Sequence, residues 1–352
     1  MLVVRKSDNV LISFCLPSYN GEKYIRQALD SILNQYEDGI EVIVCDDNSQ
    51  DETYNILKLY EKHECFSLYK NESNLGMDDN FDKVASLAKG EYLWLFGQDD
   101  VLLPGVISRI IKELKANSNT GVVYLNFSQH GDDLSDVISE SQLHKEVMQN
   151  NSDLLDKDIL FFKRSSDYFA SFEMLPSFLP ATIMKSKYWQ DARKKNFVGT
   201  AYVQLAVMLL NIGNDEIIVF SKPCVQGRVP SDKWQENGNS HFDIMTGFLI
   251  MLKNVSLLGD YVPPKNIEIF RKRFILNYLF FIDYCKSRGL VTTQDRIEKL
   301  VFLFDGFFFK MYLLSILRMN DQIRHILTVP LKMAKKLILS VNVLPRKWTY
   351  DK

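Results

Sequence analysis

Short apolar runs alternate with longer amphipathic segments along the first 127 residues of the chain. The short runs are continuously apolar or nearly so, which is typical of strands buried in a sheet. The longer segments carry apolar residues at intervals of three and four, which is typical of helices with one buried face. The pattern predicts strands at residues 10–17, 40–47, 66–71, 91–96 and 121–127, and helices at residues 21–35, 49–63, 77–90 and 104–117.

This alternation predicts an α/β fold with a mostly parallel sheet flanked by helices, because successive parallel strands are joined by right-handed crossovers. Capping-box spacing of Ser49 and Glu52 supports the start of the second helix. Beyond the alternating part, residues 130–160 are polar and acidic, which predicts a flexible or lid-like segment. We predict a main domain at residues 1–220, a linker or acceptor-side segment at 221–264 and a helical region at 265–352.

Polar clusters follow three of the predicted strands. They read Pro-Ser-Tyr-Asn from residue 17, Cys-Asp-Asp-Asn from residue 45 and Gly-Gln-Asp-Asp from residue 97. In open parallel sheets, ligands bind beyond the carboxyl ends of the strands. We therefore expect the three clusters to meet at one edge of the sheet and to form a binding site there.

The acids Asp99 and Asp100 directly follow a strongly apolar strand. Two adjacent carboxylates repel each other and are costly to remove from water, so a bound cation would stabilise both. Mg²⁺ is commonly held by one or two carboxylates together with phosphate oxygens. A surface turn is the alternative interpretation, since Gly and Asp are frequent in turns.

The other clusters also have two interpretations. Asp46 and Asp47 stand at a strand end, where a carboxylate can accept a hydrogen bond from a ribose hydroxyl or a base, or they fill a capping turn. Tyr19 can stack on a nucleobase or simply pack. The loop containing Asn74 and Gly76 precedes a helix and is compatible with an ordinary turn.

Composition excludes several functions. The formal net charge of −2 gives no overall bias toward nucleic acid. Five dispersed cysteines without a CxxC pair indicate reduced thiols and a cytoplasmic setting. No signal-peptide pattern, GxxxxGK[ST], GxSxG, HExxH or zinc-ligand spacing is present, and the apolar run at 300–317 is interrupted by Asp305 and Lys310.

Four segments in order resemble the family 2 glycosyltransferases. They are residues 12–35, 40–53, 71–81 and 88–107. Within that family the chain looks most like bacterial enzymes that build O-antigen, capsule or other surface polysaccharide, including the abequosyltransferase-like branch. The resemblance implies the Rossmann-like GT-A fold, with a nucleotide-sugar-binding catalytic domain at residues 1–220.

The resemblance also implies roles for individual residues. Asp99 and Asp100 match the metal motif that holds Mg²⁺ or Mn²⁺ on the donor diphosphate, and Asp47 matches the acid that contacts the nucleobase. The residues that match donor-binding positions are Pro17, Tyr19, Glu22, Asp46, Asp47, Asn74, Gly76, Gln98 and Asp99.

Two positions depart from the family pattern. Asp78 and Asp79 stand in the loop where members often carry an arginine. Thr200 and Ala201 stand where many members have an acidic pair, one acid of which is the catalytic base. The remaining candidates for the base are Asp191, His241 and Asp243, and for each of them a structural role is the competing interpretation.

The expected function is transfer of a sugar from a nucleoside-diphosphate donor to a hydroxyl of a glycan acceptor, for which a lipid-linked glycan is the favoured candidate. A sugar nucleotidyltransferase and a non-catalytic nucleotide-sugar binder or scaffold are the alternatives. The basic tail at residues 318–352 includes an amphipathic stretch, which favours contact with the anionic inner face of the cytoplasmic membrane. Packing of the tail on the catalytic domain, or a homodimer contact, is the competing expectation.

Overall fold

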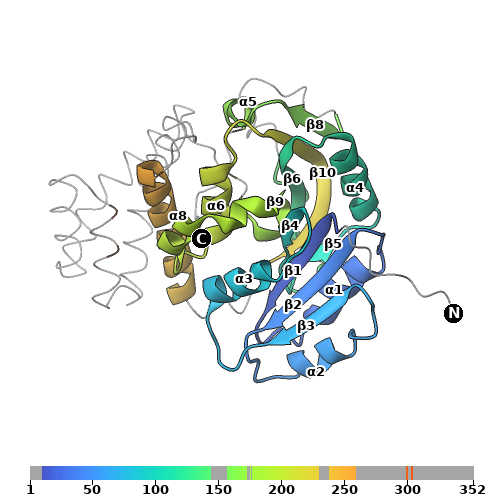
Figure 1. Cartoon of the computed structure of the whole chain (residues 1–352). Helices are drawn as coiled ribbons and strands as arrows, with labels where there is room; N and C mark the ends of the chain where they lie inside the picture. Colours follow the sequence, from blue (N-terminus) through green and yellow to red (C-terminus); the bar gives the residue numbers. More distant parts are fainter. Residues whose placement is uncertain are drawn as a thin grey trace. The chain divides into compact units, whose positions relative to one another are not determined.

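The computed structural model describes residues 10–143, 157–172, 175, 177–229, 238–258, 299 and 303. The chain divides into two compact units, one of residues 1–233 with 257–263 and one of residues 234–256 with 264–352. The first unit holds the sheet and is described below (Figure 1). In the second unit the structure describes helix α8 (Gly238–Leu258).

One sheet organises the first unit, with strand order β3-β2-β1-β4-β9-β6-β10-β5. Strands β1 (Ile12–Ser18), β2 (Ile40–Asp46), β3 (Phe66–Lys70) and β4 (Tyr92–Leu95) are the first four predicted strands. All three pairings among them are parallel. The carboxyl ends of β2, β1 and β4 therefore lie side by side.

The other half of the sheet has mixed strand directions. Strand β9 (Thr182–Lys185) pairs antiparallel with both β4 and β6 (Thr120–His130). Strand β10 (Glu216–Arg228) then runs parallel to β6. Three short strands add antiparallel pairs: β5 (Val101–Leu102), β7 (Val137–Ser139) and β8 (Ile159–Phe162). The α/β class is confirmed, but the sheet is mixed, because β9 is inserted between two strands that the local pattern placed in one parallel series.

Helices connect these strands where the apolar periodicity predicted them. The first four are α1 (Ile25–Leu33), α2 (Thr53–Lys58), α3 (Met77–Ser86) and α4 (Val106–Ala116). The later part adds α5 (Ser165–Ser171), α6 (Val203–Asn211) and the 3-10 turns η3 (Leu179–Ala181), η4 (Ser186–Gln190) and η5 (Ala192–Phe197). Within the described ranges, no helix is long and apolar enough to cross a bilayer.

The predicted capping box at the start of α2 does not form. The N-cap is Glu52, without a side-chain capping bond, and the helix begins at Thr53. The Ser49 hydroxyl donates to Asp46 Oδ1 at 2.5 Å and its backbone amide donates to Asp46 Oδ2 at 3.1 Å. Asp46 thus binds the residue that the sequence assigned to the helix start.

Aromatic rings fill the centre of the sheet around β1 and β4. Phe14 and Trp94 lie with ring centroids 4.4 Å apart, and both are fully buried. The indole nitrogen of Trp94 donates to the carbonyl of Pro180 at 2.9 Å, so the polar end of the ring is also satisfied. This packing holds β4 in place and fixes where its carboxyl end emerges.

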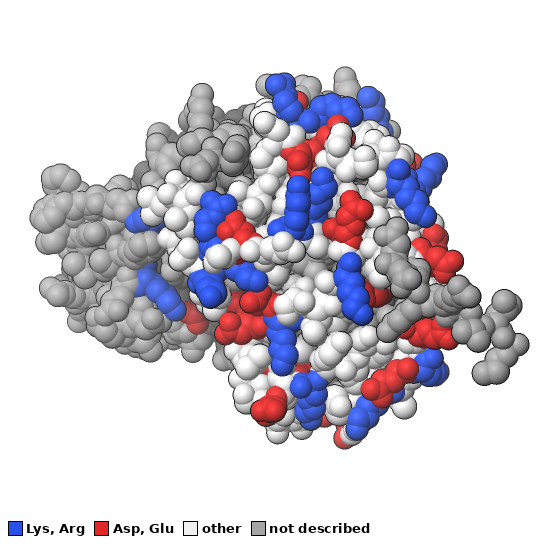
Figure 2. Space-filling view, in the orientation of Figure 1, with Lys and Arg blue, Asp and Glu red and all other residues white. Residues whose placement is uncertain are grey.

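Two of the predicted segment boundaries, at residues 220 and 265, can be compared with the described part of the chain. Strand β10 continues through residue 220, where the sequence predicted the main domain to end. The helical region predicted from residue 265 onward lies outside the described residues, apart from 299 and 303. On the face drawn in Figure 2, acidic and basic side chains are interspersed, in line with the small net charge.

Candidate active site

The three polar clusters meet around the carboxyl end of β1. On one side, the Asp47 amide donates to the Ser18 carbonyl at 2.7 Å. On the other side, Gln98 Oε1 accepts from the Ser18 hydroxyl at 2.8 Å and from the Tyr19 amide at 3.0 Å. A β-carbon on Gly21 would lie 2.2 Å from Gln98 Oε1, so Gln98 in this position packs directly against the glycine.

Asp47 fixes the loop that leads into α3. Its carboxylate accepts from the Asn71 amide group at 2.7 Å, from the Leu75 backbone amide at 2.8 Å and from the Gly76 backbone amide at 3.0 Å. Asn74 donates to the Asp47 carbonyl at 3.3 Å. Gly76 has a φ of +88°, a conformation that favours glycine. The structure therefore brings Asp47, Asn74 and Gly76 together.

The remaining matched residues of the first two clusters differ in exposure. Asp46 is fully buried and bonded to Ser49. Glu22 is exposed, and its carboxylate accepts from the Glu52 amide at 2.9 Å, which ties the β1 loop to the start of α2. Pro17 is half-buried within β1, and the Tyr19 ring is 42% exposed beside it. The exposed Tyr19 ring is thus available to a ligand at this edge.

Asp100 is a buried carboxylate at the carboxyl end of β4. Its Oδ1 accepts from the Arg228 backbone amide at 3.0 Å, and a β-carbon on Gly97 would lie 2.3 Å from its Oδ2. Burial and the neighbouring charge of Asp99 raise the pKa of Asp100 well above its usual value. Asp99 is half-buried, so the pair combines one enclosed and one more accessible carboxylate.

This donor set fits a divalent cation that also binds phosphate. Among the residues the structure describes, no group of three or more His, Cys, Asp or Glu side chains is arranged to hold a metal. Two carboxylates are nevertheless sufficient for Mg²⁺ when phosphate oxygens complete its coordination. A cation would also offset the repulsion between the Asp99 and Asp100 carboxylates.

Arg228, at the end of β10, is a site residue that the sequence did not reveal. It is only 7% exposed, and its guanidinium lies 4.4 Å from the Tyr24 ring centroid and donates to Gln27 Oε1 at 2.8 Å. Its Nε is buried without a partner among the described residues. Arg228 is 128 positions from Asp100 in the sequence, so only the pairing of distant strands brings the two together.

Of the three candidate bases, Asp191 is the one that the structure describes within the first unit. Asp191 is bound by Arg193 at 2.6 Å and by the Asn211 side chain at 2.9 Å. The hydrogen bond and charge of Arg193 lower the pKa of Asp191 to about 2, which favours a structural role. Asp243 is exposed on α8 in the second unit, and the side chain of His241 lies outside the described part.

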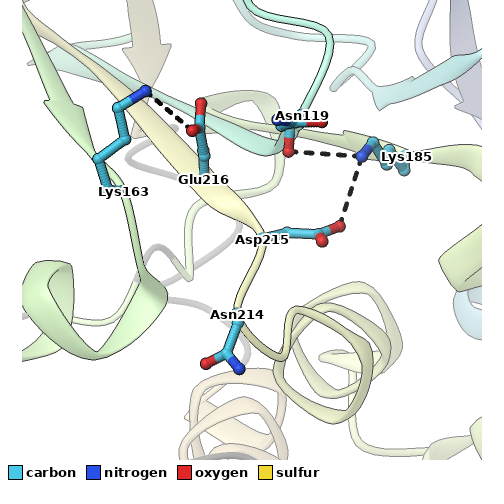
Figure 3. Close-up of a pocket in the computed structure, with 6 residues that line it drawn as sticks. All are labelled: Asn119, Lys163, Lys185, Asn214, Asp215 and Glu216. Carbon is cyan, nitrogen blue, oxygen red and sulfur yellow. Dashed lines mark hydrogen bonds and ion pairs between the residues drawn. The ribbon is translucent and has the colours of Figure 1, made fainter.

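A separate polar pocket of about 300 Å³ lies where β6 and β10 begin (Figure 3). This is the edge of the sheet opposite the carboxyl end of β1. Its lysines are paired, Lys163 with Glu216 at 2.9 Å and Lys185 with Asp215 at 3.5 Å. The pocket therefore offers no unbalanced charge, and we assign it no role in the reaction.

Comparison with known proteins identifies the family. Residues 13–166 match the family model described as "Glycosyl transferase family 2". This segment is a family 2 glycosyltransferase domain. It contains all three clusters and nearly all of the parallel half of the sheet. The protein is a glycosyltransferase with the GT-A fold.

Two curated relatives of this glycosyltransferase are themselves named as sugar transferases. Abequosyltransferase RfbV of Salmonella typhimurium is 28% identical over 278 residues, covering 74% of this chain and 78% of that protein. The GalNAc(5)-diNAcBac-PP-undecaprenol beta-1,3-glucosyltransferase of Campylobacter jejuni is 30% identical over 168 residues, covering 46% of this chain and 51% of that protein.

A solved structure shares the fold across almost the whole chain. The mannosyltransferase PcManGT of Pyrobaculum calidifontis, in complex with GDP-Man and Mn²⁺, superposes with a TM-score of 0.52 at 13% identity. The match covers 94% of this chain and 84% of that one. At this identity the likeness concerns the fold alone.

Proposed function

We propose that this glycosyltransferase moves a sugar from a nucleoside-diphosphate donor to a hydroxyl of a lipid-linked glycan during synthesis of a bacterial surface polysaccharide. The observation that carries the proposal is the meeting of Asp47, Gln98 and the Asp99–Asp100 pair around one strand end. Nucleotide-sugar binding needs a ring or polar group for the base and a cation that compensates the charge of the diphosphate. This edge has an exposed ring, Tyr19, and a pair of carboxylates that would hold such a cation.

The residues of the site would share the binding of the donor. The exposed Tyr19 ring is available to stack on the base. Asp47 would act by fixing the 71–76 loop, because three hydrogen bonds already occupy its carboxylate. Asp99 and Asp100 would hold Mg²⁺ or Mn²⁺. When bound, this cation would offset negative charge that develops on the departing diphosphate.

The relatives support the classes of donor and acceptor. PcManGT is described with GDP-Man and Mn²⁺, which supports a nucleotide-sugar donor and a divalent metal here. The Campylobacter jejuni enzyme is named for an acceptor on PP-undecaprenol, which supports a lipid-linked acceptor. The abequosyltransferase supports a place in surface polysaccharide synthesis.

The substitution Asp100→Asn tests the metal role. We expect transfer to fall by roughly 10²–10³-fold, as when a group that stabilises transition-state charge is removed. The measurement is release of nucleoside diphosphate and sugar transfer with Mn²⁺ and with EDTA, with folding checked by circular dichroism. The matched control is Asp167→Asn, an exposed acid on α5 paired with Arg164.

Wild-type transfer that persists in EDTA would end the metal proposal. Donor binding by the wild type, seen as a thermal shift, without turnover on any lipid-linked acceptor would instead favour the non-catalytic binder.

A further inference from the structure

Asp78, in the first turn of α3, binds the turn that precedes α6. Its Oδ2 accepts from the backbone amides of Gly199 at 2.6 Å and Ala201 at 3.1 Å. Both partners lie beside or at the positions where the family's acidic pair is missing. The two departures from the family pattern, which are more than 120 residues apart in the sequence, therefore meet in the structure.

The turn held by Asp78 has an uncommon backbone conformation. Gly199 has a φ of +85° and Ala201 a φ of +64°, and a left-handed conformation is uncommon for alanine. Such conformations persist where the surrounding structure enforces them, and they cluster at functional sites. Here the enforcing group is the Asp78 carboxylate, which holds the amides on both sides of Thr200.

Two buried oxygens beside this turn lack a hydrogen-bond donor among the described residues. One is Asp78 Oδ1, on a residue that is 6% exposed, and the other is Gln204 Oε1, on a residue that is 5% exposed. Buried polar atoms are nearly always hydrogen-bonded in native proteins. Both atoms can only accept, so the missing partner must be a donor, and a sugar hydroxyl is such a group.

The position of Asp78 connects it with the donor site. Gly76, whose amide binds Asp47, is only two residues away at the start of α3. Gly199, which donates to Asp78, is exposed, so the turn held by Asp78 lies at the surface. Asp78 is therefore placed between the loop fixed by Asp47 and the turn before α6.

We propose that Asp78 is the catalytic base of this enzyme, with Oδ1 as the proton acceptor and Gln204 Oε1 as a second acceptor for the hydroxyls of the incoming sugar. This inference rests on the proposed sugar transfer. Burial raises the pKa of Asp78 above its usual value, which strengthens it as a base.

The step is balanced without a further reactant. The acceptor O–H bond breaks and its proton moves to Asp78 Oδ1, while the acceptor oxygen forms a bond to the anomeric carbon. The bond from that carbon to the diphosphate oxygen breaks, and its electron pair leaves with the diphosphate. Asp78 then releases the proton to water.

The test compares Asp78→Asn with Asp82→Asn. An asparagine oxygen at position 78 can still accept from Gly199 and Ala201, so the turn is retained while the basic oxygen is lost. We expect turnover to fall by about 10²–10⁴-fold with donor affinity unchanged within about threefold. Asp82, on the same helix, binds Trp189 at 2.8 Å, and Asp82→Asn should keep turnover within about threefold.

Chemical rescue separates a base from a structural clamp. In Asp78→Ala, added formate can accept the proton, so we expect formate to restore at least about tenfold of the lost turnover. Near-normal turnover of Asp78→Asn, or a loss that formate does not restore, would overturn the inference. Absence of transfer by the wild type would instead refute the proposed function itself.

Discussion

At the scale of single residues, the contacts of Asp191 favour a structural role for its carboxylate. Its carboxylate caps η5 by accepting from the Arg193 amide at 2.8 Å and pairs with the Arg193 guanidinium at 2.6 Å. This pairing lowers its pKa to about 2, which leaves a weak base at neutral pH. Asp78, by contrast, is buried, and this burial raises its pKa.

The substitution Asp191→Asn should therefore lower the free energy of unfolding and leave turnover unchanged. Because the folded-state pKa is lowered, the stabilisation is fully present above the usual value near 3.8 and is lost as the pH falls through about 2. We expect a loss of about 1–2 kcal/mol at pH 7 by urea unfolding, a difference that shrinks below pH 4.

The exposed pair Arg164–Asp167 provides the control for that experiment. Asp167→Asn should change the unfolding free energy by less than about 0.5 kcal/mol, because solvent screens exposed ion pairs. A large fall in turnover of Asp191→Asn at unchanged stability would restore Asp191 as the candidate base.

At the scale of elements, Asn126 joins β6 to two other segments. Its amide nitrogen donates to the carbonyl of Ser221 on β10 and to the hydroxyl of Ser141. Its Oδ1 accepts from the backbone amides of Phe127, Gln142 and Leu143. One fully buried side chain thus fixes residues 141–143 against the strand pair β6–β10.

Asn126→Ala should destabilise the first unit by about 2–4 kcal/mol, because the buried amides of Phe127 and Leu143 and the Ser221 carbonyl lose their bonds to this side chain. The measurement is the free energy of unfolding in urea. Asn117→Ala is the matched control, since the Asn117 side chain donates to the Glu113 carbonyl within the same segment, beside the end of α4. Equal effects of the two substitutions would contradict the assigned role of Asn126.

At the scale of the whole molecule, the basic C-terminal stretch is proposed to bind anionic membranes, where a lipid-linked acceptor would be found. Reversing the charge of Lys332, Lys335 and Lys336 to Glu in the full chain should weaken binding to anionic vesicles. Each basic residue near such a surface contributes about 1 kcal/mol, so we expect at least a 10²-fold loss in a flotation assay.

The control variant carries Glu in place of three exposed lysines of the first unit, Lys89, Lys112 and Lys115. It should bind vesicles and float to the same extent as the wild type. Flotation that is unchanged by reversal at 332, 335 and 336 would contradict the membrane proposal. A change in sedimentation instead of flotation would favour the alternative homodimer contact.

The sequence by itself determined the parallel half of the fold and the chemistry at its edge. Strand and helix periods are local properties, so β1 to β4 and α1 to α4 follow from the spacing of apolar residues. The ends of adjacent parallel strands coincide, and Asp47, Gln98, Asp99 and Asp100 could therefore be expected at one edge from their positions alone.

Only the tertiary structure decided the remaining relations. Three of these relations join segments that are far apart in sequence. Strand β9 lies between β4 and β6, Arg228 donates to Asp100, and Asp78 binds the turn at residues 199–201. Local propensity does not encode which distant strands pair or which buried oxygen lacks a donor. Those outcomes depend on which strands pair across the whole sheet and on which side chains the folded chain then brings into contact.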